Sequence, residues 1–315
     1  MKNNNGLVER VISGAVLVVI LLIAGIIGGS VLLFLIVASS LIGLHEFYKA
    51  TGVFTVSAEN KKDNTLAIAG IAGSSIYFLL IALGGILPVY MDFSDLFSGD
   101  TSFFGMLSAM DNLRQIMTLS YIYTMLIFII VMLGVIYGIY VFMFPRFNIE
   151  KVAYTFIGVV YVPVFMSFVY LTRLLPNGKY LIWLIFISSW ICDTAAYFVG
   201  CSIGKHRLAP ILSPKKSIEG AVGGVVGACI VAVIFGYLVE YKLFGGNNNS
   251  IRYLIICAVG SIVSQIGDLS ASGIKRNKDI KDYGTLIPGH GGILDRFDSV
   301  IFTAPFIFML AWAIF

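Results

Sequence analysis

Charged residues are concentrated in a segment near the C-terminus that runs from Lys275 to Asp298, where they alternate with His290 and several glycines. Glycine allows a backbone to approach a ligand closely. Carboxylates beside cations can hold a metal ion together with the phosphates that it neutralises. Asp268 lies just upstream, and with Asp295 and Asp298 it predicts an oxygen-rich pocket suited to Mg²⁺ shared with phosphates.

A second concentration of charge lies between residues 205 and 219. Lys215, Lys216 and Ser217 stand directly before an apolar run in the stretch Ser213–Gly220. The free N–H groups and the dipole at a helix N-terminus favour phosphate. Alternatively, the lysines only anchor the loop to anionic membrane lipid. The neighbouring Ser217 and Glu219 favour a phosphate ligand.

Three acidic residues occur within or beside long apolar runs. Asp193 interrupts one run, Asp268 lies near the end of another, and Glu46 ends a third. A carboxylate within a membrane is expensive and indicates a functional site. Glu46 and Asp268 could simply reach the membrane interface, whereas Asp193 lies deeper.

The elements that must position these residues are membrane-spanning helices. Of the 315 residues 58% are hydrophobic and 12% are charged, with a net charge of +4. This composition excludes a secreted disulfide scaffold, a disordered chain and an ordinary soluble enzyme. We therefore expect an all-α integral membrane protein, a polytopic bundle of about nine transmembrane helices. The expected spans are 11–27, 30–48, 65–87, 119–144, 152–172, 180–204, 219–239, 251–273 and 298–315, with a turn at Gly28-Gly29-Ser30.

The basic residues indicate the topology. With a cytoplasmic N-terminus and an outside C-terminus, 16 of the 21 Lys and Arg residues lie on the cytoplasmic side and 5 outside, as the positive-inside rule requires. The first apolar run is too long for a cleaved signal peptide. We expect an N-terminal transmembrane region, residues 1–150, of about four helices with an external loop over 88–117. Residues 151–315 form a C-terminal catalytic region with cytosolic loops 205–219 and 274–298.

Three further features leave alternatives open. Five apolar residues of the external loop could line a surface helix, or the loop could fold onto the bundle. The glycines between 220 and 227 permit close helix packing, either within one chain or in a homodimer. The four cysteines form no CxxC pair and are expected to be buried.

Common catalytic and nucleotide-binding patterns are absent. His45-Glu46 is not a zinc-protease motif because Lys49 stands where the second histidine is required. The segment 200–206 falls short of a Walker A loop, and nothing indicates a nucleic-acid partner. The residues favour catalysis on a nucleotide or lipid phosphate over ion conduction.

The run Ser272-Gly-Ile-Lys-Arg276, Lys278-Asp279, Lys281-Asp282 and Ile287-Pro-Gly-His-Gly-Gly-Ile-Leu-Asp-Arg-Phe-Asp298 resembles the signature of the phosphatidate cytidylyltransferase (CDP-diacylglycerol synthase) family. The stretch Ser213–Gly220 and the spacing Asp193-x3-Tyr197-x2-Gly200 are similar to the family as well. The resemblance covers about the C-terminal 125 residues. The N-terminal half matches only as an apolar region ending in His45-Glu46-Phe47-Tyr48.

The resemblance implies that CTP and phosphatidate from the inner leaflet give CDP-diacylglycerol and pyrophosphate with Mg²⁺, a second cation being left open. It implies an active site that faces the cytoplasm at a bacterial plasma membrane. Asp268 and Asp295 are the expected metal ligands, and Asp298 is a third carboxylate. The other expected site residues are Lys275, Arg276 and Arg296 as phosphate clamps; His290, Gly291 and Gly292 beside the leaving group; and Lys215, Lys216, Ser217, Ser272, Lys281 and Asp193 in substrate binding.

Two rival functions remain. A CTP-dependent lipid-alcohol kinase would transfer the γ-phosphoryl group instead. An ion-coupled transporter would use Asp193 and Asp268 as intramembrane ion sites. The motif of the CDP-alcohol phosphotransferases is absent from the sequence.

Overall fold

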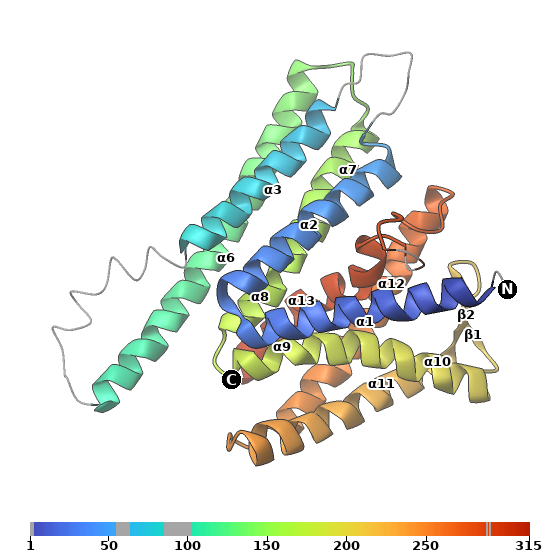
Figure 1. The fold of residues 1–315 in the computed structure, drawn as a ribbon. Coiled ribbons are helices and arrows are strands. Elements are labelled where there is room, and N and C mark those ends of the chain that lie inside the picture. The colour runs from blue at the N-terminus through green and yellow to red at the C-terminus, as the bar shows by residue number, and fades with distance from the viewer. Residues whose placement is uncertain (1–2, 55–63, 85–102, 288, 290) are drawn as a thin grey trace.

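The computed structural model describes residues 3–54, 64–84, 103–287, 289 and 291–315, with the backbone alone for 3–11 and 103–117. The described chain is helical almost throughout and contains one short β-hairpin (Figure 1). The helices of the N-terminal half are α1 (Asn3–Ile27), α2 (Gly29–Thr51), α3 (Thr65–Gly84) and α6 (Phe103–Phe142).

Three helical rods of the C-terminal half contain a π-helical segment. They are α7–η1–α8 (Ile149–Val159, Val160–Val164, Phe165–Leu174), α9–η2–α10 (Gly178–Phe186, Ile187–Ile191, Cys192–Ile203) and α11–η3 (Ile218–Ile234, Phe235–Leu243). The remaining elements are α12 (Ser250–Asn277), α13 (Leu294–Ile314) and the antiparallel strands β1 (Arg207–Ala209) and β2 (Ser213–Ser217).

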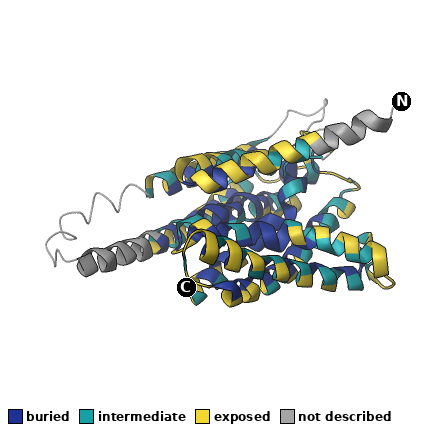
Figure 2. Ribbon diagram, turned by 60° about the horizontal axis from the view of Figure 1, so that its bottom comes forward, coloured by how far each residue is buried: buried dark blue, intermediate teal, exposed yellow. Residues whose placement is uncertain are grey.

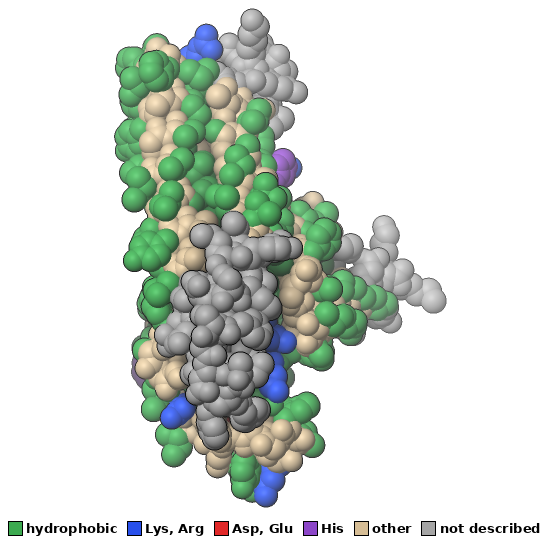
Figure 3. Space-filling model, turned by 90° about the vertical axis from the view of Figure 1, so that its left-hand side faces the viewer, with side chains coloured by type: hydrophobic (Ala, Val, Ile, Leu, Met, Phe, Trp, Pro, Cys, Tyr) green, Lys and Arg blue, Asp and Glu red, His purple; other side chains and the backbone are tan. Residues whose placement is uncertain are grey.

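Eight of these rods are long and apolar enough to cross a membrane, and α1 contributes a shorter apolar stretch over Ile12–Ile27. The chain is thus an all-α polytopic membrane protein, and nine helical rods occur in its described residues, as predicted. Buried residues fill the middle of the bundle and exposed ones line its outer faces (Figure 2). Hydrophobic side chains extend along the face shown in Figure 3, with few charged ones among them. Such a surface suits a lipid solvent.

The predicted turn between the first two helices is confirmed. Gly28 and Gly29 have φ of +68° and +51°, a region that glycine enters without strain. The helix α1 ends at Ile27 and α2 begins at Gly29, so two rods share the first apolar run.

The expected loops differ from the observed ones. The segment 103–117 is the start of α6, whose backbone forms one continuous helix to Phe142, so the loop expected over 88–117 is shorter than predicted. The rest of that predicted loop, 88–102, and the side chains of the proposed surface helix lie outside the described residues. The loop 274–298 shrinks to 278–293, because α12 continues to Asn277 and α13 starts at Leu294. Loop 205–219 contains the hairpin β1–β2.

The glycine-rich face of α11 packs on α10 of the same chain. A Cβ atom at Gly220 would lie 2.7 Å from the carbonyl oxygen of Ala196, and one at Gly227 would lie 2.6 Å from the Cβ of Ala195. Only a residue without a side chain allows this approach. The stripe therefore serves packing within the chain. Of the four free cysteines, Cys192 and Cys257 are buried as expected, whereas Cys201 is exposed.

Candidate active site

The loop between α12 and α13 is organised by the carboxylate of Asp295, in the first turn of α13. Its Oδ2 accepts hydrogen bonds from the N–H groups of Tyr283 at 2.8 Å, Gly292 at 3.0 Å and Gly284 at 3.4 Å. Gly291 adopts φ of +83°, and a Cβ there would lie 3.0 Å from the same oxygen. The side chain of Asp295 is only 1% exposed. One acidic side chain thus fixes the backbone of a glycine-rich loop.

Glu46 of α2 supports the same loop from the N-terminal half of the chain. Its Oε1 accepts the N–H of Ile293 at 3.1 Å and its Oε2 accepts the N–H of Leu294 at 2.9 Å. Negative charge at a helix N-terminus is favourable, so Glu46 caps α13. A Cβ on Gly292 would lie 2.4 Å from Oε2 of Glu46, which leaves room for glycine alone.

From its sequence position alone, Glu46 could simply reach the membrane interface. Its partners lie 247 and 248 residues away, and no local pattern reveals such a contact. The available signal was a carboxylate at the end of an apolar helix. The neighbouring side chains of Phe47 and Tyr48 are fully buried, so the end of α2 is fixed in the bundle and Glu46 is held in place.

Glu46→Ala is expected to lower the free energy of unfolding by about 2–4 kcal/mol, because it removes the acceptor of two N–H groups at the start of α13. Glu150→Ala is the matched control, since the side chain of Glu150 is 58% exposed and should contribute less than about 1 kcal/mol. Denaturant unfolding of the detergent-solubilised protein measures both. Equal losses in the two variants would show that Glu46 is not the cap we describe.

Lys275 of α12 joins the two acidic residues of α13. Its Nζ lies 3.0 Å from Oδ1 of Asp295 and 3.7 Å from Oδ2 of Asp298. It also lies 5.3 Å from the centre of the Tyr283 ring, within reach of a cation–π contact. Burial, with the nearby charges of Asp298 and Asp295, raises the pKa of the Tyr283 hydroxyl. That hydroxyl therefore stays protonated and donates to the carbonyl of Ala271 at 3.1 Å.

The hairpin β1–β2 places a second cationic side chain, that of Lys216, beside α12. Nζ of Lys216 forms an ion pair with Oδ2 of Asp268. Ser217 caps α11, its Oγ accepting the N–H of Gly220 at 3.1 Å. Oε2 of Glu219 accepts the N–H group of Lys205 at 3.1 Å. The hairpin is therefore fixed at both ends, and Lys216 is held against α12.

Two cavities border these charges. The larger, about 680 Å³, lies between the hairpin, α10, α11 and α12; the smaller, about 280 Å³, lies between α1, α10 and α13. Asp193 lines both cavities and so stands between them. The other charged or hydroxyl-bearing lining residues are Tyr197, Arg207, Ser213, Lys215, Lys216, Ser217 and Asp268 in the larger cavity, and Ser13, Thr194, Asp295, Arg296, Asp298 and Ser299 in the smaller.

Some charged and polar groups in this region lack a compensating partner among the described residues. Asp268 interacts electrostatically with both Asp193 and Asp298. The Nε of Arg296 is buried and has no acceptor among the described residues. A buried donor without an acceptor is costly. An anion in the smaller cavity would supply the missing acceptor.

Most of the predicted site residues converge. The structure gathers Asp193, Lys215, Lys216, Ser217 and Asp268 around one cavity, and Asp193, Asp295, Arg296 and Asp298 around the other, with Lys275 joining the acidic pair.

Other predicted site residues lie apart. Arg276 is exposed, and its Nη1 donates to the carbonyl of Ile280 at 3.3 Å. Lys281 is exposed and Ser272 is half-buried, and neither lines the two cavities. Gly292 supports the carboxylates of Asp295 and Glu46. His290 lies outside the described residues.

The carboxylates of the site fit a metal ion that binds together with the phosphates of a substrate. In the described part of the chain, no three His, Cys, Asp or Glu side chains converge into a ready-made metal site. Mg²⁺ is commonly held by one or two carboxylates together with substrate phosphates. Asp268 and Asp298 suit that arrangement, since each has a carboxylate oxygen with no hydrogen bond to the described protein.

These features define a polytopic membrane protein whose carboxylates and lysines gather around two adjoining cavities. The chain belongs to the cytidylyltransferase family, whose sequence profile matches residues 8–314. It is 39% and 40% identical over 165 residues to the phosphatidate cytidylyltransferases of Staphylococcus haemolyticus and Staphylococcus aureus, and 38% identical to that of Bacillus subtilis. The match covers 52% of this chain and 60–61% of these relatives, about three fifths of their length.

Proposed function

We propose that the protein transfers the cytidylyl group of CTP to phosphatidate, giving CDP-diacylglycerol and pyrophosphate. The observation that carries the proposal is the convergence of Lys216–Asp268 and Lys275–Asp295–Asp298 beside two adjoining cavities. Family membership supports it, and the curated relatives are named for this activity.

The chemistry requires two anions to meet. A phosphate oxygen of phosphatidate attacks the α-phosphorus of CTP and forms a new P–O bond, while the bond from that phosphorus to the β-phosphate oxygen breaks and pyrophosphate leaves. A phosphomonoester has its second pKa near about 6, so the attacking oxygen is largely ionised and needs no general base. The site must instead neutralise repulsion between the substrates.

We assign Mg²⁺ to Asp268 and Asp298. When bound there, the ion would neutralise phosphate oxygens and stabilise charge as the leaving group departs. Asp295 was the ligand expected from the sequence. Its Oδ2 already accepts three backbone N–H groups, whereas Asp298 accepts only that of Ser299 at 2.8 Å. We therefore give Asp295 a positioning role.

The cavities suggest where each substrate binds. The larger has a volume typical of small-molecule sites and is lined by Lys215, Lys216 and Arg207, which suits the triphosphate of CTP. The smaller is bounded by α1 and contains Arg296 with its unpaired Nε, which suits the phosphate of a lipid. Asp193 between them would orient the lysines or the cation.

We further propose that the protein lies in a bacterial plasma membrane with both cavities facing the cytoplasm. The hairpin and loop 278–293 lie on the side that holds 16 of the 21 basic residues in the predicted topology. CTP is then within reach of the larger cavity, and phosphatidate approaches from the inner leaflet.

The double variant Lys215→Ala/Lys216→Ala is expected to raise the KM for CTP by about tenfold or more, because it removes two cations from the larger cavity. Lys205→Ala is the control, since Lys205 contributes only its backbone to the hairpin. Steady-state kinetics with each substrate varied provides the measurement. If neither the CTP nor the phosphatidate KM changed, the two lysines would be a membrane anchor.

Pyrophosphate release by the purified protein in detergent micelles tests the proposed activity. It should require CTP, phosphatidate and Mg²⁺ together. Release of CDP in place of pyrophosphate would indicate the lipid-alcohol kinase. Ion flux in liposomes without CTP would indicate the transporter.

A further inference from the structure

Two basic residues meet at the end of the bundle opposite the candidate active site. Arg173 lies in the last turn of α8 and Lys179 in the first turn of α9, while the far end of the rod α9–η2–α10 leads to the hairpin that holds Lys216. In the predicted topology only 5 of the 21 basic residues lie on this side, and two of them are these. Basic residues are scarce on the outer side of a membrane protein. The proximity of Arg173 and Lys179 on this side therefore requires an explanation.

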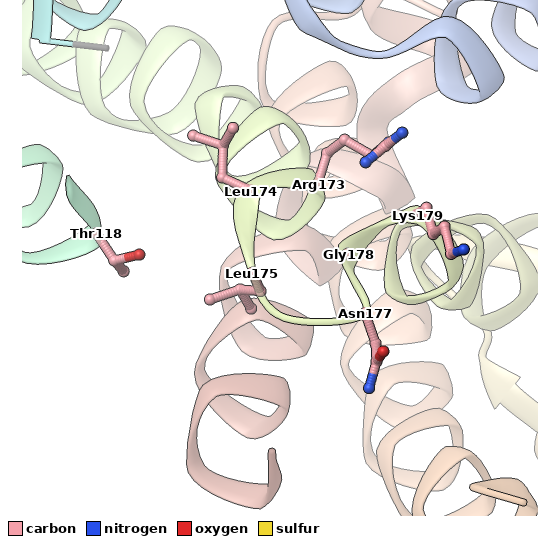
Figure 4. A pocket seen from close by; sticks show the side chains of 7 residues that line it. All are labelled: Thr118, Arg173, Leu174, Leu175, Asn177, Gly178 and Lys179. Carbon is pink, nitrogen blue, oxygen red and sulfur yellow. The ribbon is translucent and has the colours of Figure 1, made fainter. Parts of the chain in front are cut away.

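The two cations border a cavity of about 540 Å³ at the α8–α9 turn, whose lining is partly polar and partly apolar (Figure 4). Their side chains extend on the same side of the turn, away from Thr118. Nε of Arg173 donates to the carbonyl of Gly25 at 3.3 Å, and Nζ of Lys179 lies 4.8 Å from the centre of the Tyr180 ring. Neither forms an ion pair with any carboxylate of the described residues.

An apolar groove begins at the same two residues. It has a volume of about 620 Å³ and is lined by α1, α9, η2, α11 and η3, with Leu22, Trp183, Phe186, Trp190 and Phe235 among its walls. From Lys179 to Trp190 the rod rises about 17 Å at 1.5 Å per residue. That is roughly half of the 30 Å hydrocarbon thickness of a bilayer. The groove thus has the depth of one leaflet.

We propose that this surface binds an anionic phospholipid from the leaflet opposite the candidate active site. The headgroup phosphate contacts Arg173 and Lys179, and an acyl chain lies in the groove as far as Trp190. Charge complementarity selects the occupant, because two cations with no carboxylate partner among the described residues lie at the mouth of an otherwise apolar groove. Trp190 also lines the smaller catalytic cavity, so the lipid and the catalytic cavity share one wall.

Quenching of tryptophan fluorescence by brominated phospholipids measures this binding without any substrate turnover. The chain has three tryptophans, of which Trp183 and Trp190 line the groove, so Trp312→Phe gives a suitable background. In delipidated protein, brominated phosphatidylglycerol should quench at an at least tenfold lower concentration than brominated phosphatidylcholine with the same chains. Each basic residue near a membrane surface contributes about fivefold to the affinity for anionic lipid.

Lys179→Glu should remove this preference, and it replaces an exposed residue that the bundle does not need for packing. Arg252→Glu is the matched control, because Arg252 is also exposed at this end of the bundle but contacts the ring of Phe315, away from the groove. The control should retain the preference.

Equal quenching by the two lipids would overturn the proposal, since the groove would then bind acyl chains without discriminating between headgroups. A preference that survives Lys179→Glu would overturn it too, as would native mass spectrometry that shows a second copy of the chain and no retained lipid. Because none of these readouts requires CTP, they are independent of the proposed catalytic function.

Discussion

Asp298→Asn is expected to lower kcat by a factor of about 10³, with the side chain still packed near the start of α13. The substitution retains an oxygen that can accept the N–H of Ser299, now at 2.8 Å from Oδ1, but it removes the negative charge. If Asp298 binds Mg²⁺, that charge is what neutralises the ion and holds it against phosphate, and such electrostatic contributions reach about 3–4 kcal/mol. Steady-state kinetics over a range of Mg²⁺ concentrations measures the effect.

The exposed Asp279 provides the control for this substitution. Its φ of +53° lies in the left-handed region, which asparagine adopts more readily than most residues. Asp279→Asn should therefore leave kcat within about twofold. Full activity in both Asp298→Asn and Asp268→Asn would remove the metal assignment altogether.

Asp295→Asn separates a positioning residue from a metal ligand. The amide cannot both accept three N–H groups through one oxygen and attract Lys275 through the other. We expect a lower free energy of unfolding together with lower kcat, and an unchanged Mg²⁺ concentration for half-maximal rate. A large rise in that concentration without loss of stability would return Asp295 to the metal site.

Lys275→Met is expected to abolish turnover and to lower the free energy of unfolding by about 3–5 kcal/mol. The side chain of Lys275 is 12% exposed and is placed between two acidic side chains that are 1% and 11% exposed. Removing one partner of a buried ion pair leaves uncompensated buried charge. Denaturant unfolding and the pyrophosphate assay on the same preparation measure the two effects.

Two further variants make this prediction specific. Lys275→Met/Asp295→Asn should recover part of the lost stability, because one unpaired carboxylate is gone, while activity stays absent. Lys278→Met removes a neighbouring cation whose partner Glu150, at 2.7 Å, is 58% exposed, and should cost less than about 1 kcal/mol. Stability unchanged by Lys275→Met would contradict the structural role we give this lysine.

The helices were predictable because spanning a bilayer requires a recognisable pattern of apolar residues in the sequence. A slab of about 30 Å demands charge-free runs of about twenty residues, and Gly28-Gly29 divides the one run that is too long. Their ends were less predictable. The rod α12 continues through Lys275 and Arg276 to Asn277. Backbone hydrogen bonds can extend a helix beyond the hydrocarbon core of the bilayer, and charged side chains at such a helix end can reach water.

The hairpin and the site pairings could not be foreseen. Strand β2 consists of Ser213–Ser217 and includes a proline and two lysines, a composition that does not favour a strand. The pairing of Lys216 with Asp268 spans 52 residues, and that of Glu46 with Leu294 spans 248. Composition predicted that carboxylates and lysines would gather, but which of them meet depends on how the rods pack.

The most direct test of cytidylyl transfer uses CTP that is radiolabelled at one of its phosphates and identifies the product that carries the label. With CTP labelled at the α-phosphate, the radioactivity should appear in a lipid-soluble product that requires phosphatidate. With CTP labelled at the γ-phosphate, it should appear in pyrophosphate and none in lipid. Lipid carrying the γ-label, with CDP as the second product, would contradict cytidylyl transfer and would indicate a kinase.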